Sequence, residues 1–226
     1  MPDVTPAIMP TYGRRLPVTF SRGEGAVLYD TADRAYLDGL SGIAVTNLGH
    51  RHPRVTEAVI EQAKRLVHTS NLFQIGLQEA VAEQLRAMTG MENMFFCNSG
   101  AEANEAAIKL ARRFGHQKGV EKPKIIVLDG AFHGRTIGAL SATGNQKIRQ
   151  GFGPLLEGFE RVPPNDLAAI DALGVALNDV VAVLVEPILG EGGIRPLDTD
   201  YLHGLRTLCT KNQWLLMFDE VQTGNG

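Results

Sequence analysis

The chain has 226 residues, of which 44% are hydrophobic, and a formal net charge of -3. This composition allows a sizeable buried core and gives no bias toward polyanions, so we expect no nucleic-acid partner. Every apolar run is much shorter than the roughly 20 residues that span a bilayer, and prolines interrupt the N-terminus where a secretory signal needs an apolar stretch. We therefore expect a cytoplasmic protein that does not cross a membrane. Cys97 and Cys209 lack CxxC spacing and are predicted to be buried, reduced thiols that bind no metal.

The sequence pattern of the first 90 residues predicts a hairpin-like arm followed by two helices. Two short β-type stretches in a region rich in Pro and Gly indicate a hairpin-like arm. A proline suited to a first helical turn, followed by apolar residues at helical spacing, predicts the first helix, and a glycine ends the second. The hairpin is expected over Ala26–Asp30 and Arg34–Asp38, and the helices over Pro53 to about His68 and Leu77 to Gly90.

After Gly90, short apolar runs alternate with amphipathic helices, which is the pattern of a mostly parallel sheet with crossover helices. The fold class is therefore α/β. The predicted strands are Met94–Cys97, Lys124–Leu128, Val180–Val185 and Trp214–Phe218. The predicted helices are Ala101–Phe114, Asp166–Leu177, Asp200–Lys211 and a shorter one that begins near Thr136. A strand so near the chain end has no helix to cover it, so the sheet is expected to be truncated.

The first motif that carries chemistry, Asn98–Glu105 (NSGAEANE), joins a predicted strand to a predicted helix. A helix N-terminus presents unpaired N–H groups and partial positive charge, and Gly100 allows a phosphate to approach the backbone closely. Ser99 and Glu102 also have the spacing of an ordinary capping box, which is the better interpretation of the motif taken alone. Both can apply at once.

The second motif, Gly130–Thr136 (GAFHGRT), follows the predicted strand that ends at Leu128. At the carboxyl edge of a parallel sheet, Phe132 can stack on a planar heterocycle, and Arg135 offers a fork to a carboxylate. For an isolated pair the plainer interpretation is that Phe132 fills the core and Arg135 pairs at the surface. His133 is predicted to be structural or to support neighbouring site residues.

Two acidic motifs follow the later strands. Glu186 precedes a glycine-rich stretch that contains Glu191, and two carboxylates beside glycines at a strand end suggest a functional site. The alternative is a glycine-rich turn with solvated acids, and it is stronger for Glu191 than for Glu186. Asp219 begins the segment DEVQTG after five apolar residues, and a buried acid there needs a cationic partner. A protonated pyridine nitrogen of pyridoxal phosphate (PLP) would serve. The alternative is that Asp219 caps a following helix.

In this order, the four motifs resemble those of the class III, ornithine-type, PLP-dependent aminotransferases, and the resemblance covers essentially the whole chain. The segments Thr11–Val18 and Leu37–Pro53 resemble the acetylornithine branch of the family. The resemblance implies a fold-type-I PLP-transferase large domain with a mostly parallel sheet. Residues 53–226 would form this large domain incompletely, residues 1–52 would be an N-terminal arm and part of the small domain, and the C-terminal remainder would be absent.

The resemblance also assigns residues to the cofactor and to the substrate. The cofactor residues would be Gly100 and Ala101 for the phosphate, Phe132 and Val221 for the two faces of the ring, Asp219 for the ring nitrogen, Gln222 for the ring hydroxyl and Glu186 for the ring surroundings. The substrate residues would be Arg135, which would bind the α-carboxylate, with Tyr12 nearby and Glu191 shaping specificity.

One family feature is missing from this sequence. The lysine that holds the cofactor follows the DEVQTG segment in the family, and none of the seven lysines here stands at a strand end in a matching motif. We therefore expect an N-terminal fragment without a Schiff-base lysine and without turnover of its own.

For the complete protein, the resemblance implies a homodimer that moves the δ-amino group of N-acetylornithine to 2-oxoglutarate, giving glutamate, in arginine biosynthesis. Three alternatives stay open. The first is another class III enzyme that acts on succinylornithine, ornithine or 4-aminobutyrate. The second is a catalytically silent PLP-fold binding partner, and the third is an unrelated phosphate-binding α/β module.

Overall fold

The computed structural model describes residues 7–9, 11, 13 and 15–225. The chain divides into two compact units, Met1–Glu79 and Ala80–Gly226, and each is described by itself. Helix α3 (Gly76–Thr89) contains the boundary and matches the second predicted helix. The predicted assignment of residues 1–52 and 53–226 concerns the domains of a longer protein and stays a prediction.

The first unit contains a three-stranded antiparallel sheet of β1 (Phe20–Glu24), β2 (Val27–Asp30) and β3 (Ala35–Leu37), in that order. Strands β2 and β3 confirm the predicted hairpin, whereas β1 has no apolar alternation and was missed. The remaining elements are α1 (Ser41–Ala44), a single turn with positive φ at each residue, and α2 (Pro53–Arg65). Helix α2 begins at the predicted proline and ends before His68, because Leu66 is already extended.

The second unit is built on a parallel sheet with the order β5-β4-β6-β9. Three of its strands, β4 (Lys124–Leu128), β6 (Val180–Val185) and β9 (Leu215–Phe218), confirm predicted ones. The fourth, β5 (Phe159–Val162), was missed because Glu160 and Arg161 break its apolar pattern. Short elements near the carboxyl edge are α6 (Gln146–Arg149), β7 (Ile188–Leu189) and β8 (Arg195–Pro196).

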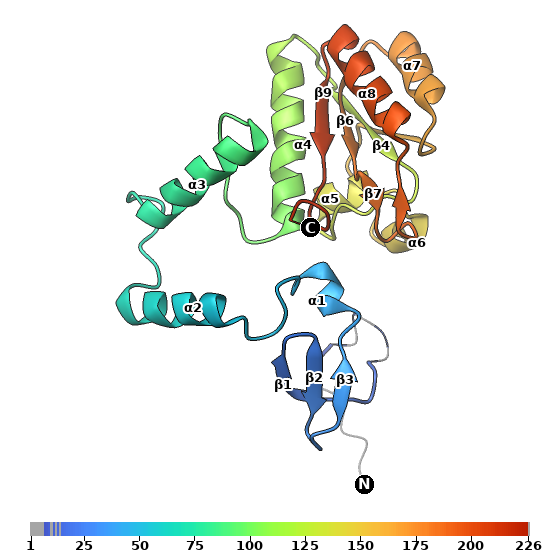
Figure 1. Cartoon of the computed structure of the whole chain (residues 1–226). Coiled ribbons are helices and arrows are strands. Elements are labelled where there is room, and N and C mark those ends of the chain that lie inside the picture. The colour runs from blue at the N-terminus through green and yellow to red at the C-terminus, as the bar shows by residue number, and fades with distance from the viewer. Residues whose placement is uncertain (1–6, 10, 12, 14, 226) are drawn as a thin grey trace. The chain divides into compact units, whose positions relative to one another are not determined.

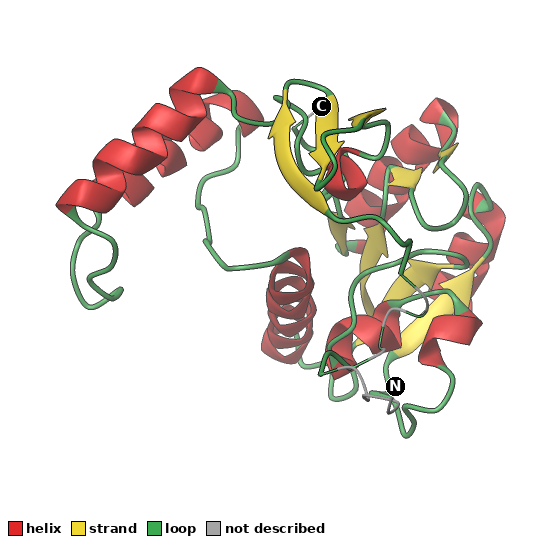
Figure 2. Cartoon of the chain, turned by 90° about the horizontal axis from the view of Figure 1, so that it is seen from below, coloured by secondary structure: helices red, strands yellow, loops and turns green. Residues whose placement is uncertain are grey.

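Helices cover both faces of this sheet, as Figures 1 and 2 show. On one face, Ile126, Val183 and Val185 pack in one buried cluster with α7 (Leu167–Ala176) and α8 (Thr199–Asn212). Residues of opposite parity, such as Ile125 and Leu184, point to the other face and pack with α4 (Gly100–Gln117) and α5 (Ile137–Ala142). Because β4 and β6 are buried on both faces, their sequences are almost continuous apolar runs.

Two local expectations were wrong, one on Met94–Cys97 and one on Cys97. The segment Met94–Cys97 is not a strand, because none of the described strands pairs with it and an unpaired segment cannot form a ladder. Cys97 is consequently exposed, whereas Cys209 is buried as predicted. Strand β9 lies at the sheet edge and is only half-buried, with Phe218 exposed.

The register of the parallel sheet aligns the carboxyl ends of β4, β6 and β9. Val185 of β6 pairs with Phe218 of β9, and Leu184 pairs with both Met217 of β9 and Val127 of β4. The N–H of Asp219 continues this ladder by donating to the carbonyl of Val185 at 2.8 Å. The residues that follow β4, β6 and β9 therefore emerge together at the carboxyl edge, where ligands of open α/β sheets bind.

Candidate functional site

A cavity of about 310 Å³ lies at this carboxyl edge, beside the start of α4. Its volume is at the lower end of the range for small-molecule sites. Nine of the ten residues that the sequence assigned to the cofactor or the substrate line it: Gly100, Ala101, Phe132, Arg135, Glu186, Glu191, Asp219, Val221 and Gln222. The tenth, Tyr12, lies outside the described residues. The other lining residues are Asn104, His133, Gly134, Ile188 and Thr223.

The first wall of the cavity is the N-terminus of α4. Ser99 is its N-cap, and its hydroxyl accepts a hydrogen bond from the N–H of Glu102 at 3.2 Å, which confirms the first half of the predicted capping box. The carboxylate of Glu102 accepts its backbone hydrogen bond from the N–H of Asn98 at 2.6 Å. Gly100 follows at the first helical position. A Cβ there would lie only 2.7 Å from Cγ2 of Val221, so a glycine is required for this contact. Cap and glycine thus leave the backbone of the first turn open toward the cavity.

The second wall is the loop after β4. Phe132 is half-buried, and the guanidinium of Arg135 lies over its ring, 5.5 Å from the ring centroid. Gly134 has a φ of +134°, and a Cβ on it would lie 2.9 Å from Cβ of Ala101. The loop therefore packs directly against the start of α4. This arrangement places an aromatic face and an exposed cation at the same cavity.

Glu186 follows β6 and forms part of the cavity floor. It is only 8% exposed, and its Oε2 accepts a hydrogen bond from the N–H of Phe132 at 3.0 Å. Burial raises the pKa of this carboxyl, and the nearby charge of Asp219 acts in the same direction, against the lowering effects of the Phe132 bond and of His133. Glu186 thus fixes the loop that carries Phe132.

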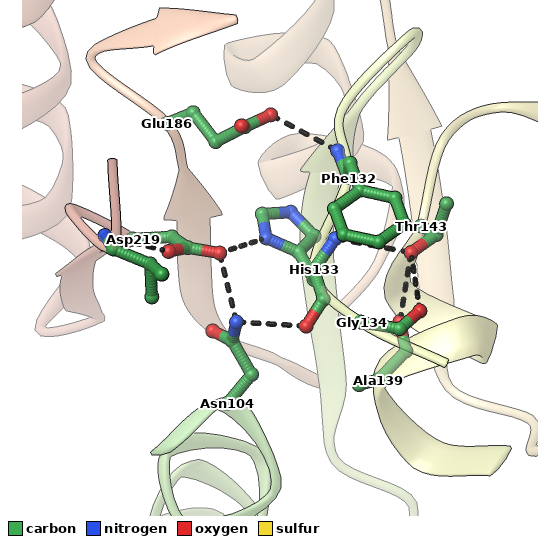
Figure 3. A network of polar contacts seen from close by, with 9 residues as sticks. Asn104, Phe132, His133, Gly134, Ala139, Thr143, Glu186 and Asp219 are labelled. Atoms are coloured by element: carbon green, nitrogen blue, oxygen red, sulfur yellow. Dashed lines mark hydrogen bonds and ion pairs between the residues drawn. The ribbon is translucent and has the colours of Figure 1, made fainter. Parts of the chain in front are cut away.

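Asp219, which follows β9, is held by two side chains (Figure 3). Its Oδ2 lies 2.8 Å from Nδ1 of His133 and accepts a second hydrogen bond of 2.8 Å from Nδ2 of Asn104. Burial opposes the charged form of Asp219, but the bond and charge of His133 together with the Asn104 bond outweigh it and lower the pKa. Asp219 therefore remains an anion inside the site. The described residues after Asp219 form a turn, and the N–H of Val221 donates to Oδ1 of Asp219 at 3.3 Å.

The turn after Asp219 closes the cavity with Val221 and Gln222. Val221 contacts the position of Gly100, as described above, and a Cβ on Gly190 would overlap Oε1 of Gln222. Glycines on two neighbouring segments therefore make room for this turn. All seven lysines lie within the described residues, and none lines the cavity.

Sequence reasoning did not assign Asn104 to the site and placed His133 only in a supporting role. Asn104 lies four residues after Gly100, which puts both on one face of α4. That spacing is the signal that could have found it. His133 is fully buried, and its Nε2 has no hydrogen-bond partner among the described residues. Both residues line the same cavity as the predicted ones.

The family model for class III aminotransferases matches residues 8–226. The chain belongs to the class III aminotransferase family. Members of this family are PLP-dependent. The match covers almost the whole chain and includes all four motifs, so the unrelated phosphate-binding module is excluded.

Individual relatives agree with this membership. The acetylornithine aminotransferase of Nitrosomonas europaea is 53% identical over 97% of this chain and 56% of its own length. Among solved structures, the ornithine aminotransferase of Toxoplasma gondii superposes with a TM-score of 0.89 at 34% identity, covering 94% of this chain and 51% of its own. The N-acetylornithine aminotransferase of Stenotrophomonas maltophilia gives a TM-score of 0.80 at 37% identity, covering 95% and 53%. The chain thus spans about half the length of the curated relatives it matches.

Within the described part of the chain, no helix is both long and apolar enough to cross a membrane.

Proposed function

We propose that the protein that contains this chain is a PLP-dependent aminotransferase that moves the δ-amino group of N-acetylornithine to 2-oxoglutarate and serves arginine biosynthesis. The observation that carries the proposal is the convergence of nine assigned residues, from four separate motifs, on one cavity. The choice of N-acetylornithine is supported by relatives of that name at 46–54% identity. Assembly as a homodimer, which rests on the family resemblance, belongs to the same proposal, and so does the cytoplasmic location expected from the sequence.

The residues of the cavity fit the cofactor in charge and in shape. The N-terminus of α4 offers unpaired backbone N–H groups at Gly100 and Ala101 to a phosphate. Phe132 and Val221 offer apolar surfaces to a flat ring. Asp219, a buried anion with a lowered pKa, suits a protonated ring nitrogen. When bound there, PLP supplies an aldehyde that reacts with amines and a ring that withdraws electrons.

The other assigned residues would bind the substrate and orient the cofactor. Arg135 stands exposed at the cavity, where its planar fork can pair with the α-carboxylate of the substrate in two parallel hydrogen bonds. Gln222 would bond the ring hydroxyl, and Glu186 holds the backbone of Phe132 so that its ring stays at the cavity. Glu191 at the cavity wall would shape specificity, and Tyr12 would stand near the substrate.

The test is amino transfer by the purified full-length protein. Glutamate formation from 2-oxoglutarate is measured with N-acetylornithine, N-succinylornithine, ornithine and 4-aminobutyrate as donors, and bound PLP is recorded from its absorption. We expect PLP binding and the highest kcat/KM with N-acetylornithine. A higher kcat/KM with another donor would reassign the substrate, and PLP binding without transfer from any donor would identify a silent family member.

A further inference from the structure

Asn104 joins three segments of the second unit through a single amide nitrogen. It lies on α4, one turn after Gly100, and only 5% of it is exposed. Its Nδ2 donates one hydrogen bond to the backbone carbonyl of His133 and another to Oδ2 of Asp219, each of 2.8 Å. Figure 3 shows the amide between these two acceptors. An amide oxygen in the place of Nδ2 would face two acceptors, so the surroundings fix the orientation of the amide.

The two oxygens of Asp219 consequently differ in their hydrogen bonds. Oδ2 has two short charge-assisted partners, Nδ1 of His133 and Nδ2 of Asn104. Oδ1 accepts from the backbone N–H of Val221 at 3.3 Å, which is a long hydrogen bond. A carboxylate oxygen can accept two hydrogen bonds. Among the hydrogen bonds of the described residues, Oδ1 is therefore the oxygen with capacity for a further donor, and Asp219 lines the cavity.

His133 alone does not fix the carboxylate. Without Asn104, the carboxylate would keep only the His133 bond on Oδ2 and the long Val221 bond on Oδ1. It could then still turn about its last side-chain bond, because that torsion is broad. Asn104 adds a second donor whose own position is tied to the backbone of the His133 loop. It also does so as a neutral group, so it orients Asp219 without neutralising the negative charge.

We infer that Asn104 is a positioning residue that holds Asp219 so that Oδ1 keeps one acceptor position open to a protonated ring nitrogen, and so gives the site its preference for a nitrogen-containing ring. The inference rests on the proposed function, because it concerns the same cavity and the same ligand class. It assigns to the second asparagine of the NSGAEANE motif a task separate from the phosphate contact of Gly100 and Ala101.

The experiment compares two ligands on the full-length protein. The first is pyridoxamine 5′-phosphate, and the second is its analogue in which C–H replaces the ring nitrogen. Dissociation constants are measured by fluorescence titration for the wild type, for Asn104→Leu, which keeps the volume without donating, and for Asn104→Ala. Asn212→Leu is the matched control, since Asn212 is a half-buried helical asparagine whose Nδ2 bonds the Leu208 carbonyl away from the cavity.

We expect both Asn104 variants to bind pyridoxamine 5′-phosphate about 10- to 100-fold more weakly, the usual effect of losing a hydrogen bond to a charged group. Their affinity for the analogue, and both affinities of Asn212→Leu, should stay at the wild-type values. Equal losses for both ligands would show a merely structural role and overturn the inference, as would unchanged affinities.

The ratio of the two dissociation constants stays informative if a variant is partly unfolded, because both ligands then meet the same folded fraction. A wild type that binds neither ligand would overturn the proposed function itself. A wild type that prefers the nitrogen-containing ring, with variants that keep this preference, would overturn only the role of Asn104.

Discussion

Glu186 and Asp219 follow neighbouring strands and line the same cavity, yet their surroundings move their pKa values in opposite directions. Burial raises the pKa of Glu186, which has one strong backbone donor at Phe132. Burial acts on Asp219 too, but His133 and Asn104 outweigh it. Two carboxyls at one site thereby acquire different tasks, as paired acids in enzymes commonly do. Asp219 keeps its charge, and Glu186 is the first of the two to take up a proton as the pH falls.

A pH series on Glu186→Gln tests this division. Folding raises the pKa of Glu186, so the protonated carboxyl contributes to stability. This contribution is complete below the ordinary pKa of 4.5 and is lost as the pH rises through the pKa of the folded state. Glutamine cannot lose a proton. We therefore expect the free energy of unfolding of Glu186→Gln to increase relative to the wild type as the pH rises from below 4.5 to neutrality.

Urea titrations of the full-length proteins at several pH values measure this difference. Glu121→Gln, at an exposed glutamate, controls for the simple loss of a charge. A difference between Glu186→Gln and wild type that stays constant across the pH range would contradict the raised pKa of Glu186.

At the scale of elements, the first turns of α3 and α4 offer a matched comparison, because each helix begins with a glycine. A Cβ on Gly100 would lie 2.7 Å and 2.9 Å from the two methyl groups of Val221, whereas a Cβ on Gly76 would meet nothing within 4 Å. We expect Gly100→Ala to displace Val221 and to destabilise the protein by about 1–3 kcal/mol, as overpacking does. Gly76→Ala should be neutral or stabilising by up to about 1 kcal/mol.

Chemical denaturation gives the two stabilities, and titration with pyridoxamine 5′-phosphate shows whether the displaced Val221 also weakens ligand binding. If Gly100→Ala matched Gly76→Ala in both measurements, the close packing of α4 against the DEVQTG turn would be refuted.

At the scale of the whole molecule, the sequence predicted most of the helices and strands that have a regular apolar pattern. It predicted few of the features that depend on pairing between strands. Strands β4, β6 and β9 and the longer helices follow from runs and spacings within one segment. Strand β5 and the non-strand at Met94–Cys97 depend on whether a neighbouring strand is present, which no local pattern records. Likewise, the strand-end rule identified Glu186 and Asp219. The bond from Asn104 to Asp219 joins residues 115 positions apart and required the fold.

The same scale yields a prediction for residues 1–226 expressed alone. Helix α2 exposes an apolar stripe that includes Val55 at 48% and Val59 at 63%, and contiguous stripes of this kind promote association. We expect sedimentation velocity to show self-association that increases with concentration and weakens in Val55→Lys/Val59→Glu. Val175→Lys, at an isolated exposed valine in the second unit, should have no effect. A monomer with a sharp cooperative melt would refute the prediction.

The register that pairs Val185 with Phe218 also limits how genes for this protein can change in length. Gaining or losing one codon within β6 or β9 would exchange the two faces of the strand, so that side chains of the α7 and α8 layer would turn toward α4. The same change would shift Glu186 or Asp219 away from its partners across the cavity. The connection from α4 to β4, at the opposite edge of the sheet, carries no cavity residue. Inherited insertions and deletions should therefore accumulate at the amino edge, while the carboxyl edge keeps a constant length.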